Sequence, residues 1–183
     1  MNARVNRKVR LMHDTSLENM RICRDRYLLP MQQGLGRNMD VVDIGALDVN
    51  GSYRPLFDDL PATYTGIDMA PGRGVDVVAD DPYAYPLTDR CADAVISGQM
   101  LEHCEFFWQA FTEMLRMVRS SGFLVLIVPS RGVIHRYPVD CYRFLPDSMP
   151  ALAKYAGCEL VEHWLDESSD WGDLVGVFRK PKR

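Results

Sequence analysis

The chain has 183 residues, of which 47% are hydrophobic and 25% charged, and this composition excludes a disordered or fibrous protein. The formal net charge is −4, which disfavours binding to nucleic acid through phosphate contacts. No apolar run reaches the roughly 20 residues of a membrane helix, and the charged N-terminus precedes no apolar segment typical of a secretory signal. We therefore expect one cytoplasmic domain without a nucleic-acid partner or a membrane span.

Charge is distributed unevenly along the chain. Residues 1–37 hold eight basic and three acidic side chains, a net charge of +5, which leaves −9 for the remaining residues. A solvated helix face explains this pattern most simply. A docking surface for an anionic substrate is the alternative.

A helix is predicted first. Thr15 to Glu18 has the form of a capping box, and apolar residues follow at helical spacing until Pro30. The run Met39 to Gly45 is then typical of a short strand that ends in a glycine-bearing loop. The central sheet should begin here.

The remaining strands are predicted from apolar runs. The runs lack clean alternation, as in strands buried on both faces. They are Tyr64 to Ile67, Val75 to Ala79, Ala94 to Ile96, Phe123 to Val128, Cys158 to Trp164 and Leu174 to Phe178.

Two further helices are predicted between these strands. Apolar residues from Phe107 to Val118 recur every three or four positions, which indicates a helix. Another helix is expected around Leu152 to Ala156, ending at Gly157.

This order of elements predicts an α/β fold. We expect a Rossmann-like, doubly wound sheet of about seven mostly parallel strands, with helices on both faces and the last strand pair antiparallel. The chain should form a single domain over 1–183, with a helical cap at 1–38 and a cofactor-binding core at 39–183. Ligands of such sheets bind beyond the carboxyl ends of the strands.

Acidic residues stand at the ends of three predicted strands. Asp43 ends the first and Asp68 the second, while Asp80 and Asp81 both follow the third. A carboxylate about 20 residues beyond a glycine loop is well placed to bind two ribose hydroxyls. Gly45 and Gly51 would let the backbone approach such a ligand closely.

Four short motifs in this order resemble those of the small class I S-adenosylmethionine-dependent methyltransferases. The similarity covers about residues 41–178, most of the chain. The motifs are Asp43-Ile44-Gly45, residues 81–87 (DPYAYPL), Leu101-Glu102-His103 and residues 116–122 (RMVRSSG).

The resemblance implies an S-adenosylmethionine cofactor, which leaves as S-adenosylhomocysteine. It implies that the loop with Gly45 and Ala46 meets the methionine part of the cofactor, that Asp68 binds the ribose, and that Met69 packs on the adenine. Either Asp80 or Asp81 would meet the adenine amine. Residues of the fourth-strand loop, Gly98 and Gln99, would line the pocket, and Asp43 and Gly51 complete the set.

The glycine loop departs from the family pattern. Leu47 and Val49 stand where further glycines are expected, so the loop should be longer or differently shaped. An NAD(P)-dependent oxidoreductase is the competing interpretation, but its fingerprint, Gly-x-Gly-x-x-Gly, is absent and Pro55 follows soon after.

The binding site for the methyl acceptor is predicted around a polar stretch, residues 135–144, after the fifth strand. His103, His135 and Asp140 are candidate general bases. The stretch concentrates polar groups in a region with little periodicity, so we expect it to contact the substrate. The candidate substrate-binding residues are Arg136, Tyr137, Tyr142 and Arg143.

No metal site is expected. The five cysteines are odd in number and form no Cys-x-x-Cys pair. His135 and Asp140 can both ligate a metal, but no third ligand follows at a convincing spacing.

The predicted activity is methyl transfer to an oxygen or nitrogen of a small-molecule acceptor, a class that includes sugars and sugar-lipids. A chain of this size has no room for a separate substrate domain. The alternative is a catalytically inactive protein that binds S-adenosylmethionine as a sensor or as the partner of an active subunit.

Overall fold

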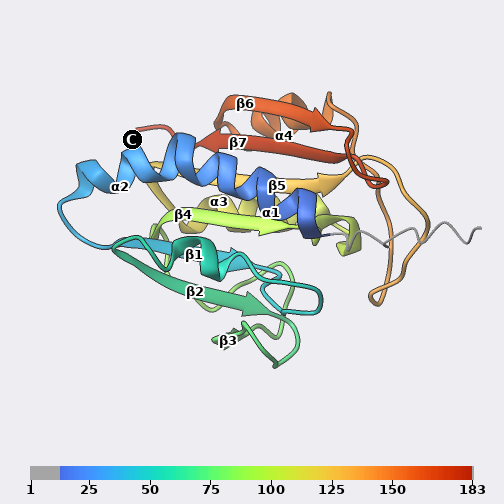
Figure 1. Ribbon diagram of the computed structural model, residues 1–183, viewed down its shortest axis with the longest axis horizontal. Helices are drawn as coiled ribbons and strands as arrows, with labels where there is room; N and C mark the ends of the chain where they lie inside the picture. Colours follow the sequence, from blue (N-terminus) through green and yellow to red (C-terminus); the bar gives the residue numbers. More distant parts are fainter. Residues whose placement is uncertain (1–12, 183) are drawn as a thin grey trace, which may run out of the picture.

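A single seven-stranded sheet organises the computed structural model, which describes residues 13–182 (Figure 1). The strand order is β3-β2-β1-β4-β5-β7-β6, parallel from β3 to β5 and antiparallel for the pairs β5/β7 and β7/β6. The predicted fold class is thereby confirmed. The strands are β1 (Met39–Ile44), β2 (Ala62–Asp68), β3 (Val77–Val78), β4 (Ala92–Gly98), β5 (Val118–Pro129), β6 (Glu159–Asp166) and β7 (Asp173–Arg179).

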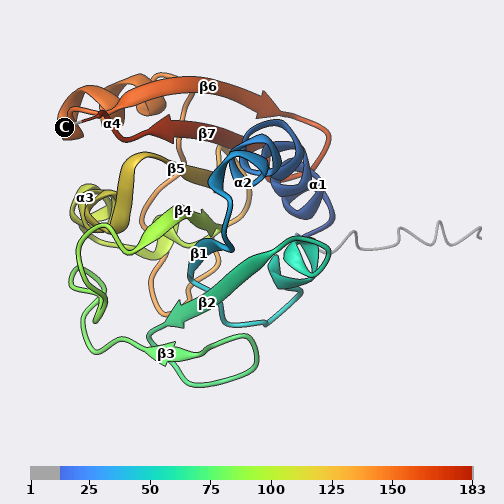
Figure 2. The same ribbon diagram turned by 90° about the vertical axis from the view of Figure 1, so that its left-hand side faces the viewer.

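Helices cover both faces of the sheet (Figure 2). The N-terminal helices α1 (His13–Cys23) and α2 (Leu29–Leu35) lie on one face, and α3 (Phe107–Met117) and α4 (Ser148–Ala156) lie on the other. Neighbouring residues of one strand point to opposite layers: Val125 packs with the α1 side and Leu124 with the α3 side. The central strands are therefore buried on both faces, which explains why their sequences do not alternate.

The N-terminal helical segment is longer than predicted at both ends. The helix already includes His13, so Thr15 lies inside it and does not cap it. A π-helical stretch, Arg24–Leu28, joins α1 to α2, and Pro30 is the second residue of α2. The helix ends instead at Gly36, which adopts a left-handed conformation with φ 67°.

The N-terminal helices pack directly on the sheet. Met20, Cys23 and Leu28 are fully buried in the same cluster as the inward-facing residues of β1, β4, β5 and β7. The division of the chain into a cap and a core at residue 38 stays a prediction.

Basic residues of this segment mostly face carboxylates. Arg21, Arg24, Arg26 and Arg37 each form an ion pair, with partners that include Glu18, Asp59, Glu162 and Asp93. This pairing is what a solvated helix face predicts. The other four basic residues, Arg4, Arg7, Lys8 and Arg10, lie outside the described residues.

The remaining elements follow the predicted order with shifted bounds. β3 is reduced to two residues, α4 begins four residues earlier than expected, and the C-terminal strands form a hairpin in which β7 lies inside the sheet and β6 forms its edge. Across residues 13–182, no helix combines the length and apolar character needed to cross a bilayer.

The carboxyl ends of β1, β2, β4 and β5 point the same way, toward the right in Figure 1. The long segment 130–147 follows β5 on that side and contains no helix or strand. The order of the strands reverses between β1 and β4, which is the place where open α/β sheets bind ligands.

Candidate functional site

A cavity of about 650 Å³ lies beyond the carboxyl ends of β1, β2 and β4. This volume falls within the usual range for small-molecule sites. One side is formed by the loops after β1 and β2, and the other by residues 98–105 after β4 and by residues 135–139 of the segment after β5. The topology thus brings most of the predicted site residues to one place.

The loop after β1 lacks the further glycines of the family pattern and is held in place by backbone hydrogen bonds. The Leu47 amide donates a hydrogen bond to the Asp68 carboxylate (3.1 Å), and the Asp48 amide donates to the carbonyl of Arg73 (2.8 Å). The loop is therefore anchored on the turn after β2. Gly45, with φ 84°, passes so close to Met100 that a Cβ atom would lie 2.8 Å from its side chain.

Asp68 and Met69 both line the cavity at the end of β2. The Asp68 oxygens accept hydrogen bonds from the amides of Leu47 and Ala70, each at 3.1 Å. Since a carboxylate oxygen has two lone pairs, each oxygen can still accept a bond from a hydroxyl. The Met69 side chain is 46% exposed and offers an apolar surface beside this carboxylate.

Asp43 is a buried carboxyl, 3% exposed, in the wall of the cavity. Its Oδ2 atom accepts a hydrogen bond from the Tyr64 hydroxyl (2.6 Å), while Oδ1 has no partner among the described residues. Burial raises the pKa of Asp43 to about 7, because the charged form loses its hydration.

The end of β4 is shaped by two special backbone positions. A Cβ atom at Gly98 would fall 1.8 Å from the hydroxyl of buried Tyr53, so only glycine fits there. Gln99 has φ 56°, and its side-chain amide donates a hydrogen bond to Asp173 (2.9 Å). Non-glycine residues with this left-handed backbone conformation are strained, and they occur more often at functional sites than elsewhere.

Two predicted cofactor residues do not reach the cavity. Asp80 and Asp81 are exposed and are not among its lining residues. The Asp81 carboxylate instead accepts a hydrogen bond from the amide of Tyr83 (2.8 Å), and Pro82 and Tyr83 form the adjacent part of the wall.

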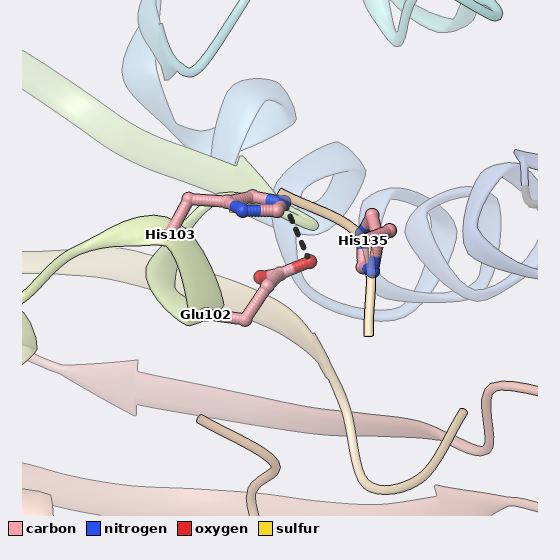
Figure 3. Close-up of side chains that lie close together, drawn as sticks. All are labelled: Glu102, His103 and His135. Carbon is pink, nitrogen blue, oxygen red and sulfur yellow. Dashed lines mark ion pairs between the residues drawn. The ribbon is translucent and has the colours of Figure 1, made fainter. Parts of the chain in front are cut away.

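His103 and His135 lie side by side in the wall, with ring centroids 4.9 Å apart (Figure 3). The His103 ring holds its Nδ1 atom 2.5 Å from the carbonyl oxygen of Val139, and burial lowers its pKa, which favours the neutral imidazole. Glu102 lies beneath them and is fully buried, and burial raises its pKa to about 8.

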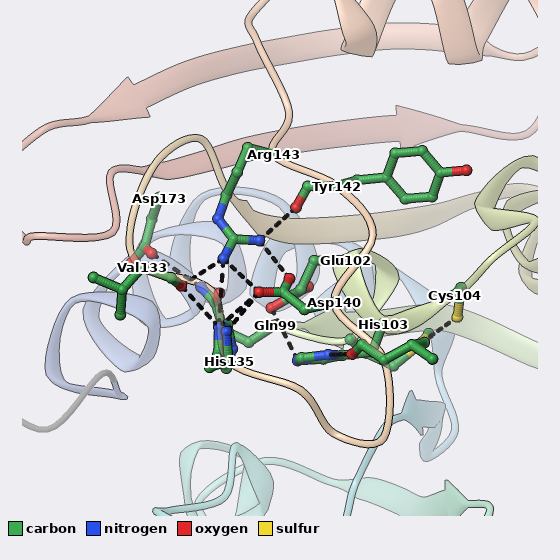
Figure 4. Close-up of polar contacts among 12 residues, drawn as sticks. Gln99, Glu102, His103, Cys104, Val133, His135, Asp140, Tyr142, Arg143 and Asp173 are labelled. Atoms are coloured by element: carbon green, nitrogen blue, oxygen red, sulfur yellow. Dashed lines mark hydrogen bonds and ion pairs between the residues drawn. The ribbon is translucent and has the colours of Figure 1, made fainter.

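Asp140 and Arg143 are bound to each other and do not line the cavity. The guanidinium donates two hydrogen bonds to the carboxylate, at 2.6 and 2.8 Å, and these hold the pKa of Asp140 well below its usual range (Figure 4). Such a carboxylate is a poor proton acceptor at neutral pH, so the structure does not support Asp140 as a general base. It instead accepts a hydrogen bond from the backbone amide of His135 (2.7 Å).

The four predicted substrate-binding residues divide into two pairs. Arg136 and Tyr137 line the cavity and are exposed. Tyr142 donates a hydrogen bond from its hydroxyl to the carbonyl of Glu105 (2.7 Å), and it lies outside the lining together with Arg143.

Sequence reasoning missed two residues of the site. Glu102 was read only as part of the Leu-Glu-His motif, and nothing in a sequence shows that its carboxyl is fully buried. Tyr53 reaches the cavity from the turn after the first loop, and its hydroxyl contacts that of Ser16 on α1. A long-range contact of this kind leaves no local sequence signal.

Comparison with known proteins finds similarity to methyltransferases. Residues 42–126 match the family model described as a methyltransferase domain. This match covers a little under half of the chain and supports the resemblance to the class I S-adenosylmethionine-dependent methyltransferases. An uncharacterized methyltransferase of Mycobacterium bovis (strain BCG / Pasteur 1173P2) is 32% identical in an alignment of 94 residues that covers 44% of this chain. That match spans 37% of the relative, so the chain corresponds to little more than a third of its length.

Solved structures share the fold of this chain. The [4+2]-cyclase SpnF superposes with a TM-score of 0.72 at 16% identity, covering 92% of this chain and 82% of the cyclase. The Burkholderia thailandensis 1,6-didemethyltoxoflavin-N1-methyltransferase, solved with its substrate and S-adenosylhomocysteine, gives 0.64 at 16% identity, covering 92% and 85%. One neighbour is a cyclase and the other a methyltransferase, so the fold alone does not determine the reaction.

Residues of this cavity fit the cofactor of the family, S-adenosylmethionine. Gly45 and Gly98 have no space for a side chain, which keeps the backbone bare where a ligand would lie. Asp68 retains acceptor capacity for a diol, and apolar Met69 adjoins it.

Proposed function

We propose that this chain transfers a methyl group from S-adenosylmethionine to an oxygen or nitrogen of a small-molecule or sugar-type acceptor. The observation that carries the proposal is the composition of one cavity. Its β1/β2 side offers bare backbone and a diol-binding carboxylate, and its other side presents two imidazoles. A cofactor and an acceptor could thus meet in a single cavity.

The cofactor would lie along the β1 and β2 loops. Gly45 and Ala46 would contact its methionine part, Asp68 its ribose hydroxyls, and Met69 its adenine. When bound, S-adenosylmethionine supplies an electrophilic methyl group on a sulfonium. Positioning an acceptor in line with that group can account for several kcal/mol of the barrier, on the order of 7 in favourable cases.

The acceptor would enter beside the segment after β5. Tyr137, which is 59% exposed, presents an aromatic ring at the rim, and the neighbouring Arg136 presents a cation. An aromatic ring together with a hydrogen-bonding cation suits a sugar-type acceptor, particularly one that carries an anionic group. The favoured substrate class is therefore a hydroxyl-bearing small molecule.

A proton acceptor is needed if the acceptor atom is a hydroxyl oxygen. His103 and His135 are the candidates that line the cavity, and the lowered pKa of His103 keeps its ring neutral and able to accept a proton. General base catalysis of this kind contributes roughly 10²- to 10⁴-fold.

The first test is thermal unfolding of the chain with S-adenosylhomocysteine, S-adenosylmethionine and NAD in parallel. A ligand that binds only the folded state raises its stability by about 2.7 kcal/mol at 100 times its dissociation constant. We expect the two adenosyl ligands to raise the melting temperature and NAD to leave it unchanged. A shift with NAD alone would overturn the cofactor assignment.

The second test is methyl transfer from radiolabelled S-adenosylmethionine to a panel of sugar, phenol and amine acceptors. Label transferred to a hydroxyl-bearing acceptor supports the proposal. Binding of the adenosyl ligands without transfer to any acceptor of a broad panel would favour the inactive sensor or partner instead.

A further inference from the structure

We propose that Glu102, His103 and His135 bind one divalent transition-metal ion in the wall of the cavity. One potential ligand atom from each residue lies within 4.8 Å of the other two (Figure 3). Two of the residues come from the turn after β4 and the third from the segment after β5. This proposal revises the expectation from the sequence, in which Glu102 was not considered as the third ligand.

Glu102 supplies the strongest observation. Its side chain is 0% exposed, and neither carboxylate oxygen has a hydrogen-bond partner among the described residues. The nearest recorded contact, to His103 Nε2, is 3.7 Å long and exceeds hydrogen-bonding distance. Buried carboxylates are normally paired, hydrogen-bonded or bound to a metal, so this group lacks a partner that a cation would provide.

His103 is oriented as a metal ligand. Its Nδ1 atom lies 2.5 Å from the Val139 carbonyl oxygen, which can only accept, so Nδ1 carries the proton. The lone pair is then on Nε2, the atom that faces Glu102. Metal-binding histidines almost always donate their second ring nitrogen to a carbonyl or a carboxylate in this way.

His135 offers a second buried ring nitrogen. Its Nε2 atom has no hydrogen-bond partner among the described residues (Figure 4). Its Nδ1 atom lies 3.4 Å from each of three groups, which are Asp140 Oδ2, the Val133 carbonyl oxygen and the Arg143 guanidinium. The two oxygens can accept a proton carried on Nδ1, and the lone pair is then on Nε2, where a metal can bind it.

Two imidazoles and one carboxylate select the class of ion. This donor set suits Zn²⁺, Mn²⁺, Fe²⁺ or Co²⁺ better than Ca²⁺ or Mg²⁺, which prefer oxygen ligands. Three protein ligands leave coordination positions open, as in catalytic sites. Since His103 and His135 line the cavity, the open positions would face it.

An oxygen of the methyl acceptor would fill an open position, and this part rests on the proposed function. A bound cation lowers the pKa of a coordinated hydroxyl, so the proton leaves to solvent. The resulting oxygen anion then forms a bond to the methyl carbon while the carbon–sulfur bond breaks, which yields a methyl ether and S-adenosylhomocysteine. The imidazoles would thus serve as ligands and would not accept the proton.

The test is metal binding by the untagged 183-residue chain after removal of metals with a chelator. Co²⁺ and Mn²⁺ are titrated separately, with cobalt followed by its visible absorption and both followed by calorimetry. We expect one equivalent to bind. Glu102→Gln and His135→Ala should each weaken binding at least about 100-fold, because loss of even an outer partner of a ligand costs 10- to 100-fold. His163→Ala, at an exposed histidine outside the cluster, is the matched control.

Binding of S-adenosylhomocysteine is measured on the same samples to separate the two proposals. If the adenosyl ligand binds but no metal binds at one equivalent, the metal site is wrong and the proposed function stands. If metal binds with the expected variant pattern but the adenosyl ligand does not, the proposed function fails alone. Equal losses in His163→Ala and His135→Ala would also overturn the metal site.

Discussion

The two sides of the cavity are built from different chemistry. The β1/β2 side consists of backbone amides, glycines and apolar surface, and its Asp68 carboxylate is held by two backbone amides. The side formed by β4 and the segment after β5 is held by charged side chains, with Arg143 locking Asp140 behind His135. The first side combines close-packed backbone with one carboxylate that can still accept hydrogen bonds, and the second contains groups that can accept a proton or a cation.

The two sides shift the pKa of a buried carboxyl in opposite directions. Asp43 on the first side has no cation in hydrogen-bonding contact, and burial raises its pKa to about 7. Asp140 on the second side is 1% exposed, yet the hydrogen bonds from Arg143 hold its pKa well below the usual range. The first therefore costs stability when it ionises, and the second contributes stability only when it is ionised.

The largest predicted effect is the pH dependence of Asp43→Asn. The folded state of the wild type keeps a proton on Asp43 that the unfolded state releases, so its stability falls as pH rises from about 4 to about 7. Asparagine cannot ionise, so the variant does not lose stability in this way. Relative to wild type, the variant should gain up to about 4 kcal/mol between pH 4 and pH 8, measured by urea unfolding without cofactor.

Asp58→Asn, at an exposed carboxyl, is the control for this experiment. Its stability difference from wild type should stay constant over the same range. A constant difference for Asp43→Asn as well would show that Asp43 is not protonated in the folded chain.

The next effect concerns the ligand of the β1/β2 side. Asp68→Ala should weaken S-adenosylhomocysteine binding about 100-fold by calorimetry, because hydrogen bonds to a charged group are worth about 1.5–3 kcal/mol each. Asp81→Ala, whose carboxylate accepts a bond from a turn amide outside the cavity, should bind nearly as tightly as wild type. The reverse order would move the ribose site to the end of β3.

Arg143→Met tests whether the segment after β5 can open without disturbing the β1/β2 side of the cavity. The change leaves the buried Asp140 without its cation, and we expect local opening of residues 130–147 to become easier by about 2 kcal/mol, less than for a fully buried pair because Arg143 is partly exposed. Amide hydrogen exchange in this segment should accelerate, while S-adenosylhomocysteine affinity stays within about threefold of wild type.

Arg136→Met, on the same segment, is the matched control, since its side chain is exposed. It should leave exchange unchanged. A loss of cofactor affinity in Arg143→Met as large as that in Asp68→Ala would show that the two sides fold as one unit.

The fold was predictable because its signals are local. Buried strands such as Phe123 to Val128 show as apolar runs, and Gly157 marks a helix end in sequence as it does in structure. The failures occurred where tertiary contacts decided the outcome. Pro30 suggested a helix end, yet a π-helical stretch before it lets the chain continue to Leu35 along the sheet.

The site was also predictable only in part, at residues whose position follows from the ends of strands. Strand ends place Asp43, Asp68 and Gln99 at the cavity, because the carboxyl ends of parallel strands meet at one edge. The pairing of Asp140 with Arg143 and the burial of Glu102 depend on how the segment 130–147 folds back beside the end of β4. The sequence of this segment has no hydrophobic periodicity from which its path could be predicted, so these roles are visible only in the structure.

The smallest predicted effect tests how much the apolar surface of the β1/β2 side contributes. Met69 is 46% exposed, so Met69→Ala should change the unfolding free energy by less than about 0.5 kcal/mol. If its side chain packs on the adenine, the same change should weaken S-adenosylhomocysteine about fivefold, corresponding to roughly 1 kcal/mol of lost apolar contact. Val78→Ala, at an exposed apolar residue of β3 outside the cavity, should leave affinity unchanged. Equal affinities for the two variants would place the adenine away from Met69 and toward Tyr83.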